Sequence, residues 1–212
     1  MVGIPLKVNK FDYTSSEIKV FKKLDSPKKI QDYLNSLKIN FEKGGDTCIS
    51  PRMVMRQKKA HCMEGAMFAA AALEFHGGRP LVLDLRSAAH DFDHVVAIFK
   101  EFGCYGAISK TNHAVLRFRE PVYKTVRELA LSFFHEYFDN KGVKTLRDFS
   151  NPIDLSRFDK FNWRTSEKNL FQVPDSIDDA KHYKILSKKQ IRHLRKADKI
   201  EIQAGKIVEW KR

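Results

Sequence analysis

The chain contains few cysteines and no long apolar run. Of its 212 residues three are cysteines, Cys48, Cys62 and Cys104. An odd number without paired spacing predicts neither a disulfide framework nor a zinc site. The longest apolar stretch surrounds residues 69–73, far short of the roughly 20 apolar residues of a membrane span. Residues 1–7 lack the apolar core of a secretory signal. We therefore expect reduced thiols, a cytoplasmic location and no membrane contact.

The sequence also lacks the motifs that hold common cofactors. Its ten glycines form neither a phosphate-binding loop nor a dinucleotide fingerprint. His90, Asp91, Asp93 and His94 are potential metal ligands, but ligands crowded so closely in the chain do not suit a tetrahedral site. We therefore expect no cofactor and no metal.

Positive charge is concentrated at one end of the chain. The formal net charge is +13, and residues 181–212 contribute eleven Lys and Arg against three Asp and Glu. Such a segment suits nucleic acid or an acidic protein. A solvated surface without a partner is the alternative interpretation.

The first half of the chain predicts two helices. Ser26 is a suitable N-cap with Pro27 behind it, and the apolar spacing that follows is helical. Residues 60–75 are rich in alanine and end at two glycines, which predicts a central helix packed on every side.

A sheet is predicted after Pro80. Residues 81–85, 94–99 and 105–110 read as strands, and the last two form a hairpin through Gly103. Residues 115–119 are predicted to form a further short strand.

The remainder predicts helices around the sheet and a separate tail. We expect an amphipathic helix over residues 122–137 with Pro121 at its start, and then loops up to Pro174. The tail is expected to hold a basic helix over residues 187–197 and a hairpin of residues 200–203 against 207–210. The domains predicted are 1–174, with a core of 56–138, and a basic appendage of 175–212. The fold class is α+β.

Cys62 is the candidate nucleophile. It lies in the first turn of the predicted central helix, where the helix dipole favours a thiolate. Lys58, Lys59 and His61 act in the same direction. The alternative is a small buried apolar residue, as most free cysteines are.

His94 is the candidate base, because a histidine at the mouth of an apolar strand can reach a helix N-terminus packed on the sheet. A base also needs a third group to orient it. With the turn near Gly103, residues 110–112 lie opposite His94. Asn112 is then the candidate third residue, and Ser109, one residue short of that window, is the alternative. A strand-end histidine and a turn asparagine are the simpler readings.

Residues 61–66 (HCMEGA) and, after one strand, 93–97 (DHVVA) resemble the transglutaminase-like superfamily. The resemblance covers about a third of the chain, residues 56–119. It implies a papain-like α+β core, in which a central Cys-bearing helix packs on a small antiparallel sheet with flanking helices. It also implies cysteine-dependent chemistry on peptide, amide or ester substrates.

The chain departs from the family pattern in two places. The aspartate expected on the next strand is absent, because that window holds Ser109 to Asn112, and Val96 stands where many members carry tryptophan. An asparagine can serve in the third place, as in papain-like proteases. Gln57, five residues before Cys62, is a candidate oxyanion donor by analogy with the glutamine of those enzymes; an exposed loop glutamine is the alternative.

Two functions follow from these residues. The first is a cysteine-dependent acyl-group hydrolase or transferase that uses Cys62, His94 and Asn112, with His61 and His113 as neighbours that modulate the site. The second is a catalytically silent scaffold that binds nucleic acid or an acidic partner through residues 181–212.

Overall fold

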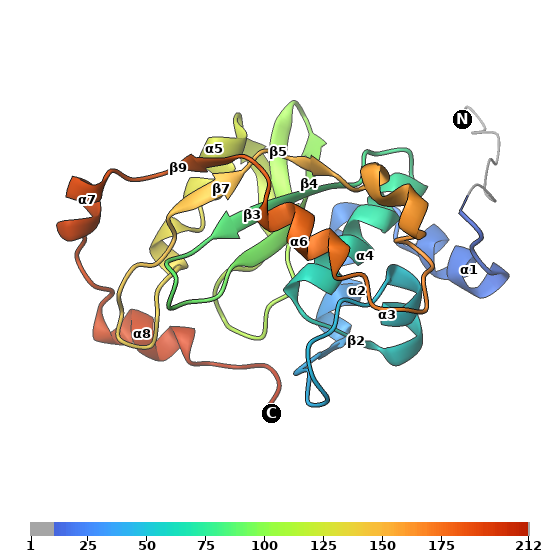
Figure 1. The fold of residues 1–212 in the computed structure, drawn as a ribbon, viewed down its shortest axis with the longest axis horizontal. Coiled ribbons are helices and arrows are strands. Elements are labelled where there is room, and N and C mark those ends of the chain that lie inside the picture. The colour runs from blue at the N-terminus through green and yellow to red at the C-terminus, as the bar shows by residue number, and fades with distance from the viewer. Residues whose placement is uncertain (1–10, 212) are drawn as a thin grey trace.

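The computed structural model describes residues 11–211, and Figure 1 shows its α+β architecture. The segment 1–7, from which we expect no secretory signal, lies outside the described residues. The main sheet is antiparallel, with the strand order β6-β5-β4-β3-β7-β9 and with β8 also beside β3. Its strands are β3 (Leu81–Arg86), β4 (His94–Glu101), β5 (Cys104–Ile108), β6 (Arg119–Tyr123), β7 (Asp148–Ser150), β8 (Ile153–Asp154) and β9 (His182–Lys184).

Four helices precede the sheet: α1 (Ser15–Lys23), α2 (Pro27–Ser36), α3 (Pro51–Gln57) and α4 (Cys62–Phe75). Both predicted helices are confirmed. Ser26 caps α2 by accepting a hydrogen bond from the N–H of Lys29, with Pro27 as the first helical residue. Helices α1 and α3 were not predicted, although Ser50 followed by Pro51 begins α3 by the same rule.

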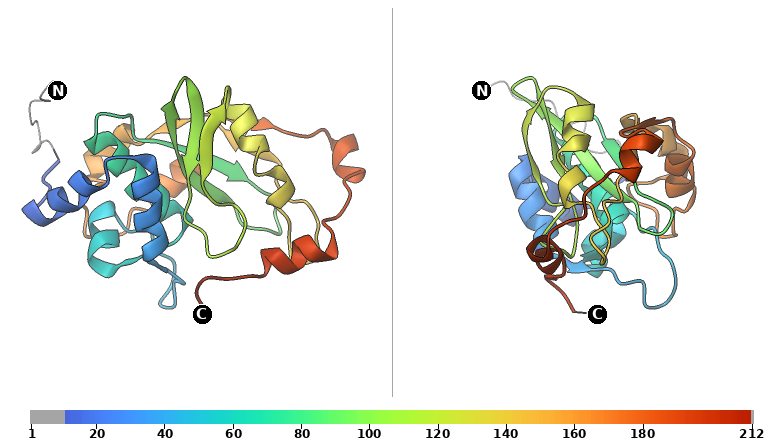
Figure 2. Two further views of the ribbon diagram at one scale, coloured as in Figure 1. Left: turned by 180° about the vertical axis from the view of Figure 1, so that it is seen from behind. Right: turned by 90° about the vertical axis from the view of Figure 1, so that its left-hand side faces the viewer.

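Helix α4 lies at the centre of the larger core. Every residue from Met63 to Ala72 is buried, as its alanine content predicts. The face of the sheet that carries Val82, Val95 and Ala97 packs with the residues of α4 and the N-terminal helices. The opposite face of the sheet packs against α5 (Val126–Leu131), so the sheet separates two apolar clusters. Figure 2 shows the ribbon from two further sides.

The hairpin of β4 and β5 is confirmed. Phe102 and Gly103 both have positive φ, at 52° and 74°, as a two-residue hairpin turn requires. The register pairs Glu101 with Cys104 and Ala97 with Ile108, where the ladder ends. The chain beyond Ile108 therefore leaves the sheet beside the start of β4, where His94 lies.

The predictions for residues 115–137 were partly wrong. Residues 119–123 form the edge strand β6, and Pro121 lies within it rather than at a helix start. Proline is tolerated there because an edge strand has no partner on one side. Helix α5 begins at Val126 after Thr125, whose side chain and Glu128 form a capping box.

The predictions for the last 70 residues were wrong in most elements. The expected loop contains β7, β8, the 3-10 helix η2 (Leu155–Phe161) and α6 (Gln172–Asp178). The basic helix α7 (Lys188–Arg192) is shorter than predicted. The expected hairpin is absent from the described residues, because Lys199–Gly205 forms helix α8.

The C-terminal segment instead contacts the chain that follows β5. The N–H of Glu209 donates to the Asn112 carbonyl at 2.9 Å, and the N–H of Ala114 donates to the Ile207 carbonyl at 3.1 Å. Strand β9, within the predicted appendage, is the outer strand of the main sheet. Within residues 11–211, no helix has both the length and the apolar character needed to cross a bilayer.

Candidate active site

Cys62 is the first residue of α4, and His61 precedes it in extended conformation. The thiol is partly buried. Burial raises the pKa of the Cys62 thiol, but hydrogen bonds from His61 and His94 outweigh burial and lower it to about 5. The amides of a first helical turn have no carbonyl partner within the helix, which adds positive potential at this position. The site therefore favours a thiolate at neutral pH.

Ser109, and not Asn112, contacts His94. The ring Nε2 of His94 lies 2.8 Å from Ser109 Oγ, and both side chains are buried. Ser109 Oγ donates its own proton to the Leu116 carbonyl at 2.5 Å. Its oxygen therefore accepts from His94, which places the ring proton on Nε2 and leaves Nδ1 for the thiol.

Asn112 is engaged elsewhere. Its Nδ2 donates to the Trp210 carbonyl and its Oδ1 accepts from the Trp210 N–H, both at 2.9 Å. The hairpin register explains this outcome. Continued past Ile108, it pairs Ser109 with Val96, two residues from His94 and on the same face of the sheet. Asn112 lies in the loop beyond the end of the ladder, where its side chain contacts Trp210.

Helix α2 holds Ser109 in place. Gln31 donates from Nε2 to the Ser109 carbonyl at 2.8 Å and accepts from the Ser109 N–H at 2.9 Å. The next residue, Lys110, is buried and its Nζ donates to the carbonyls of Leu34 and Leu37 at the end of α2. Burial lowers the pKa of Lys110 to about 8. The third residue is thus fixed by a helix almost 80 positions earlier in the chain.

A close approach brings Lys110 against α4. A Cβ built on Gly65 would lie 2.4 Å from the Lys110 Cβ. Only glycine therefore lets the helix that carries Cys62 pack against the segment that carries Ser109.

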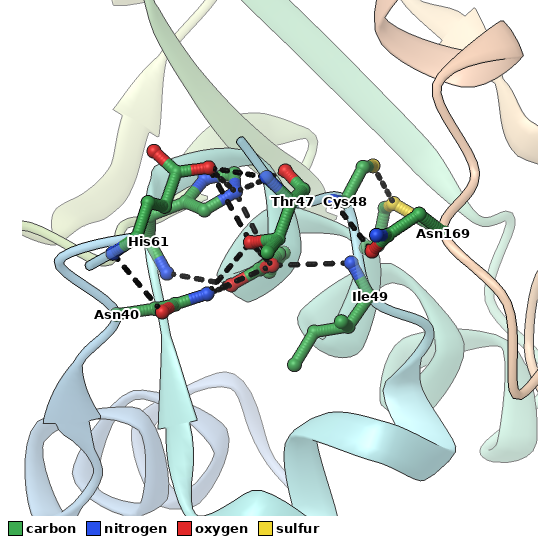
Figure 3. A network of polar contacts seen from close by, with 9 residues as sticks. Asn40, Thr47, Cys48, Ile49, His61 and Asn169 are labelled. Carbon is green, nitrogen blue, oxygen red and sulfur yellow. Dashed lines mark hydrogen bonds and ion pairs between the residues drawn. The ribbon is translucent and has the colours of Figure 1, made fainter. Parts of the chain in front are cut away.

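A buried carboxylate lies beneath His61. Figure 3 shows Asn40, Thr47, Ile49 and His61 gathered around this network. The Glu64 carboxylate accepts from Asn40 Nδ2 at 3.0 and 3.1 Å, from Thr47 Oγ1 at 2.8 Å, and from the N–H groups of Ile49 and His61 at 3.1 and 3.0 Å. Burial raises the pKa of Glu64, but these bonds and His61 outweigh it and lower the pKa to about 2.

His61 is the second imidazole at the thiol. Its Nε2 lies 3.3 Å from Glu64 Oε1 and 3.0 Å from the Thr47 carbonyl. Burial lowers the pKa of His61, but its contacts with Cys62 and Glu64 outweigh burial and raise the pKa to about 11. The sequence predicted that His61 favours the thiolate, but Glu64 was not predicted. The spacing of an N-cap residue and a glutamate three positions later could have pointed to it.

The other predicted site residues lie apart from this centre. Gln57 is exposed at the end of α3, and its role as an oxyanion donor stays a prediction. His113 is exposed, and its Nδ1 lies 2.8 Å from the Gly205 carbonyl. A cavity of about 610 Å³ lies at the opposite end of α4, lined by residues such as Leu73, His76 and Phe99; it does not include the thiol.

A second group of titratable residues surrounds Asp84 of β3. Asp84 is buried, and His182 Nε2 lies 2.9 Å from its Oδ2. Oxygens of Asp84, Asp93 and Asp178 lie within 4.8 Å of one another. Burial raises the pKa of Asp84 to about 6, and the neighbouring carboxylates act in the same direction while His182 opposes them. Carboxylates of this kind can hold a hard cation such as Ca²⁺ or Mg²⁺.

Neither the comparison with models of known protein families nor the search among curated proteins finds a match for this chain. The geometry around Cys62 is therefore the basis for inferring function.

Proposed function

We propose that the protein is a cysteine-dependent acyl-group hydrolase or transferase with a papain-like, transglutaminase-like core. One observation carries the proposal: Cys62 begins a buried central helix, and it contacts a histidine whose far nitrogen bonds to a buried hydroxyl, that of Ser109. A nucleophile, a base and a group that orients the base are the parts that covalent acyl transfer requires.

The chemistry follows from the tautomer of His94. The thiol proton passes to His94 Nδ1, and the thiolate attacks the carbonyl carbon of an amide or ester. His94 then protonates the leaving amine or alcohol as its bond to carbon breaks, which leaves a thioester on Cys62. Water or an amine gives a proton to His94 and attacks the thioester, which restores the thiolate. The N–H of Cys62, in the first helical turn, is a donor for the oxyanion.

The arrangement of elements supports the papain-like architecture. The thiol lies at the N-terminus of α4, the base at the start of β4, and its partner just after the neighbouring strand β5. In this proposal Ser109 replaces the acidic or amide third residue of the resembled family. The neutral hydroxyl keeps the ring proton on Nε2 but brings no charge that would hold a second proton on Nδ1.

Acyl-enzyme formation tests the proposal. We expect p-nitrophenyl acetate to acetylate Cys62, as measured by intact mass and peptide mapping. The Cys62→Ala variant should remain unmodified, and Cys104→Ala, which removes a buried thiol elsewhere, should react like wild type. Equal acetylation of wild type and Cys62→Ala would overturn the proposal.

The third residue is tested by a matched pair of variants. Ser109→Ala leaves the His94 N–H without its partner, and we expect acetylation to slow by about tenfold or more. Asn112→Ala removes only the contacts with Trp210 and should change the rate by less than about threefold. A larger loss of acetylation rate in Asn112→Ala than in Ser109→Ala would make Asn112 the residue that orients His94.

Nucleic-acid binding is a second candidate function, favoured by an exposed basic segment. Within residues 11–211, most of its cations have no carboxylate within ion-pair distance, and only Arg195 pairs inside the segment, with Asp198. Helix α7 lies at the end of the molecule away from the N-terminal helices in Figure 1. The exposed cations without such a pair are Lys181, Lys184, Lys188, Lys189, Arg192, Lys196, Lys199, Lys206 and Lys211.

Fluorescence polarisation with a single-stranded RNA oligonucleotide tests this function. Binding at low salt should weaken by about tenfold or more between 50 and 200 mM salt, because each phosphate contact releases counterions. Lys188→Glu with Lys189→Glu should weaken it further. The control, Lys22→Glu with Lys23→Glu on α1, carries the same change on exposed positions elsewhere. Equal losses of RNA affinity in both double variants, or no RNA binding at low salt, would exclude nucleic-acid binding by this segment.

A further inference from the structure

The Cys62 thiol contacts two histidines that have different surroundings. His61 precedes it as the N-cap of α4 and lies 3.3 Å from the Glu64 carboxylate. His94 comes from β4 and bonds to the neutral hydroxyl of Ser109 at 2.8 Å. Two imidazoles at one nucleophile leave open which of them carries the proton during the reaction.

The partners of the two rings answer that question. Glu64 is fully buried and accepts five hydrogen bonds, from Asn40, Thr47, Ile49 and the His61 backbone, so it is held as an anion. An anion in contact with an imidazole keeps the ring protonated. Ser109 brings no charge to His94, so that ring can lose and regain a proton within each cycle.

We propose that His61, held by Glu64, is a fixed cation that keeps Cys62 as a thiolate, and that the reacting proton moves only on His94. The assignment of the proton to His94 rests on the proposed acyl-transfer function. The role of His61 as a fixed cation is a property of the protein without substrate, so it does not depend on the acyl-transfer function. The proton that His94 takes from the thiol leaves with the amine or alcohol and is replaced from water or the acceptor amine.

Few other charges face the thiol. Glu42 Oε1 lies 3.7 Å from His61 Nε2 and is partly exposed. Cys48 lies on the loop before α3, and burial raises its pKa to about 12. Burial also raises the pKa of Tyr137, which packs on the other face of the sheet. These two groups are neutral at physiological pH, which leaves Glu64 and Glu42 as the anions beside His61.

The pH dependence of iodoacetamide alkylation tests the role of His61. In wild type, the alkylation rate of Cys62 should reach its plateau well below the pKa of about 8.5 of a free thiol. His61→Gln should shift the midpoint upward by more than one pH unit and lower the rate at pH 6 at least tenfold, while the plateau rate at high pH is kept. His113→Gln makes the same change at an exposed histidine and should match wild type.

The variant Glu64→Gln should shift the midpoint in the same direction as His61→Gln, because it removes the charge that holds His61 protonated. A circular dichroism spectrum confirms the fold of each variant. Should Glu64→Gln not fold, Glu42→Gln gives a second measurement, with an upward shift smaller than that of His61→Gln. A midpoint in His61→Gln equal to that of wild type would overturn the inference.

The two proposals fail differently. Alkylation needs no acyl substrate, so a His61-dependent midpoint without acetylation by p-nitrophenyl acetate overturns acyl transfer and supports His61 as the fixed cation. Acetylation that persists in His61→Gln with an unshifted midpoint overturns the role of His61 and keeps acyl transfer. Acetylation that persists in His94→Gln and disappears in His61→Gln would show that His61 carries the reacting proton. That result would overturn the assignment of roles.

Discussion

Two buried carboxylates each contact a histidine in this protein, Glu64 beside the thiol and Asp84 on the central strand β3. The histidine nitrogen lies 3.3 Å from Glu64 and 2.9 Å from Asp84. Their pKa values nevertheless move in opposite directions, to about 2 for Glu64 and about 6 for Asp84. Burial raises both, so burial does not explain the difference.

The number of donors explains it. Glu64 accepts from four residues, including two backbone N–H groups. Asp84 has one side-chain partner among the described residues, His182, and two further carboxylates within 4.8 Å. Donors favour the charged form and neighbouring anions disfavour it. A histidine contact by itself therefore does not determine the charge of a buried carboxylate.

The largest expected effect comes from removing Glu64. Glu64→Ala leaves His61 charged without its anion and leaves several buried donors without an acceptor, which should lower the free energy of unfolding by about 3–5 kcal/mol. Asp84→Ala removes one hydrogen bond and relieves the repulsion by nearby carboxylates, so about 1–3 kcal/mol is expected. Urea unfolding at pH 7 measures both. An Asp84→Ala loss as large as that of Glu64→Ala would break the comparison.

A smaller effect is the pH dependence of stability. The pKa of Asp84 rises from 3.8 to about 6 on folding, so the native state binds more protons than the unfolded state in that interval. Stability should therefore fall as pH rises from about 4 to about 6, by on the order of 2 kcal/mol. In Asp84→Asn this decrease in stability between about pH 4 and pH 6 should be absent. Glu64 contributes a slope of the opposite sign. Its stabilisation is fully present above its ordinary pKa of 4.5 and is lost as pH falls toward 2.

The smallest effect concerns the approach of α4 to Lys110. Gly65→Ala places a Cβ 2.4 Å from the Lys110 Cβ. The overlap should destabilise by about 1–3 kcal/mol, offset by about 1 kcal/mol from the better helix propensity of alanine. Gly44→Ala, where a Cβ meets nothing within 4 Å, is the control. We also expect Gly65→Ala, but not Gly44→Ala, to slow Cys62 acetylation, because Ser109 moves with Lys110.

The sequence predicted the parts of the site that depend on local signals. Alanine content and the two glycines at residues 77–78 located α4, and the Gly103 turn located the hairpin and with it His94. The structure places Ser109, and not Asn112, beside His94. Alternate residues of a strand face opposite sides, so the hairpin register alone offers both Ser109 and Thr111 to the face of His94.

Other parts of the site could not be predicted from the sequence. Gln31 lies 78 positions before Ser109, and no local pattern links a helical glutamine to a strand end. Asn40 and Thr47 reach Glu64 from a loop whose path is set by tertiary packing. Helix α8 was a different kind of miss, because Asp198 followed by Glu201 is a capping box that could have been read.

The segment that carries Ser109 is fixed from two distant parts of the chain, by Gln31 before it and by Trp210 after it. During synthesis on the ribosome, the helix of Cys62 and the hairpin of His94 emerge first, and N-terminal parts of a chain fold first. The contacts of residues 205–210 form only after nearly all the rest of the chain has been made. We expect a nascent chain that ends at residue 200 to carry an accessible thiol whose base is poorly oriented, as pulse alkylation and acetylation of stalled chains would measure. The reactive state of the protein is then a product of completed synthesis.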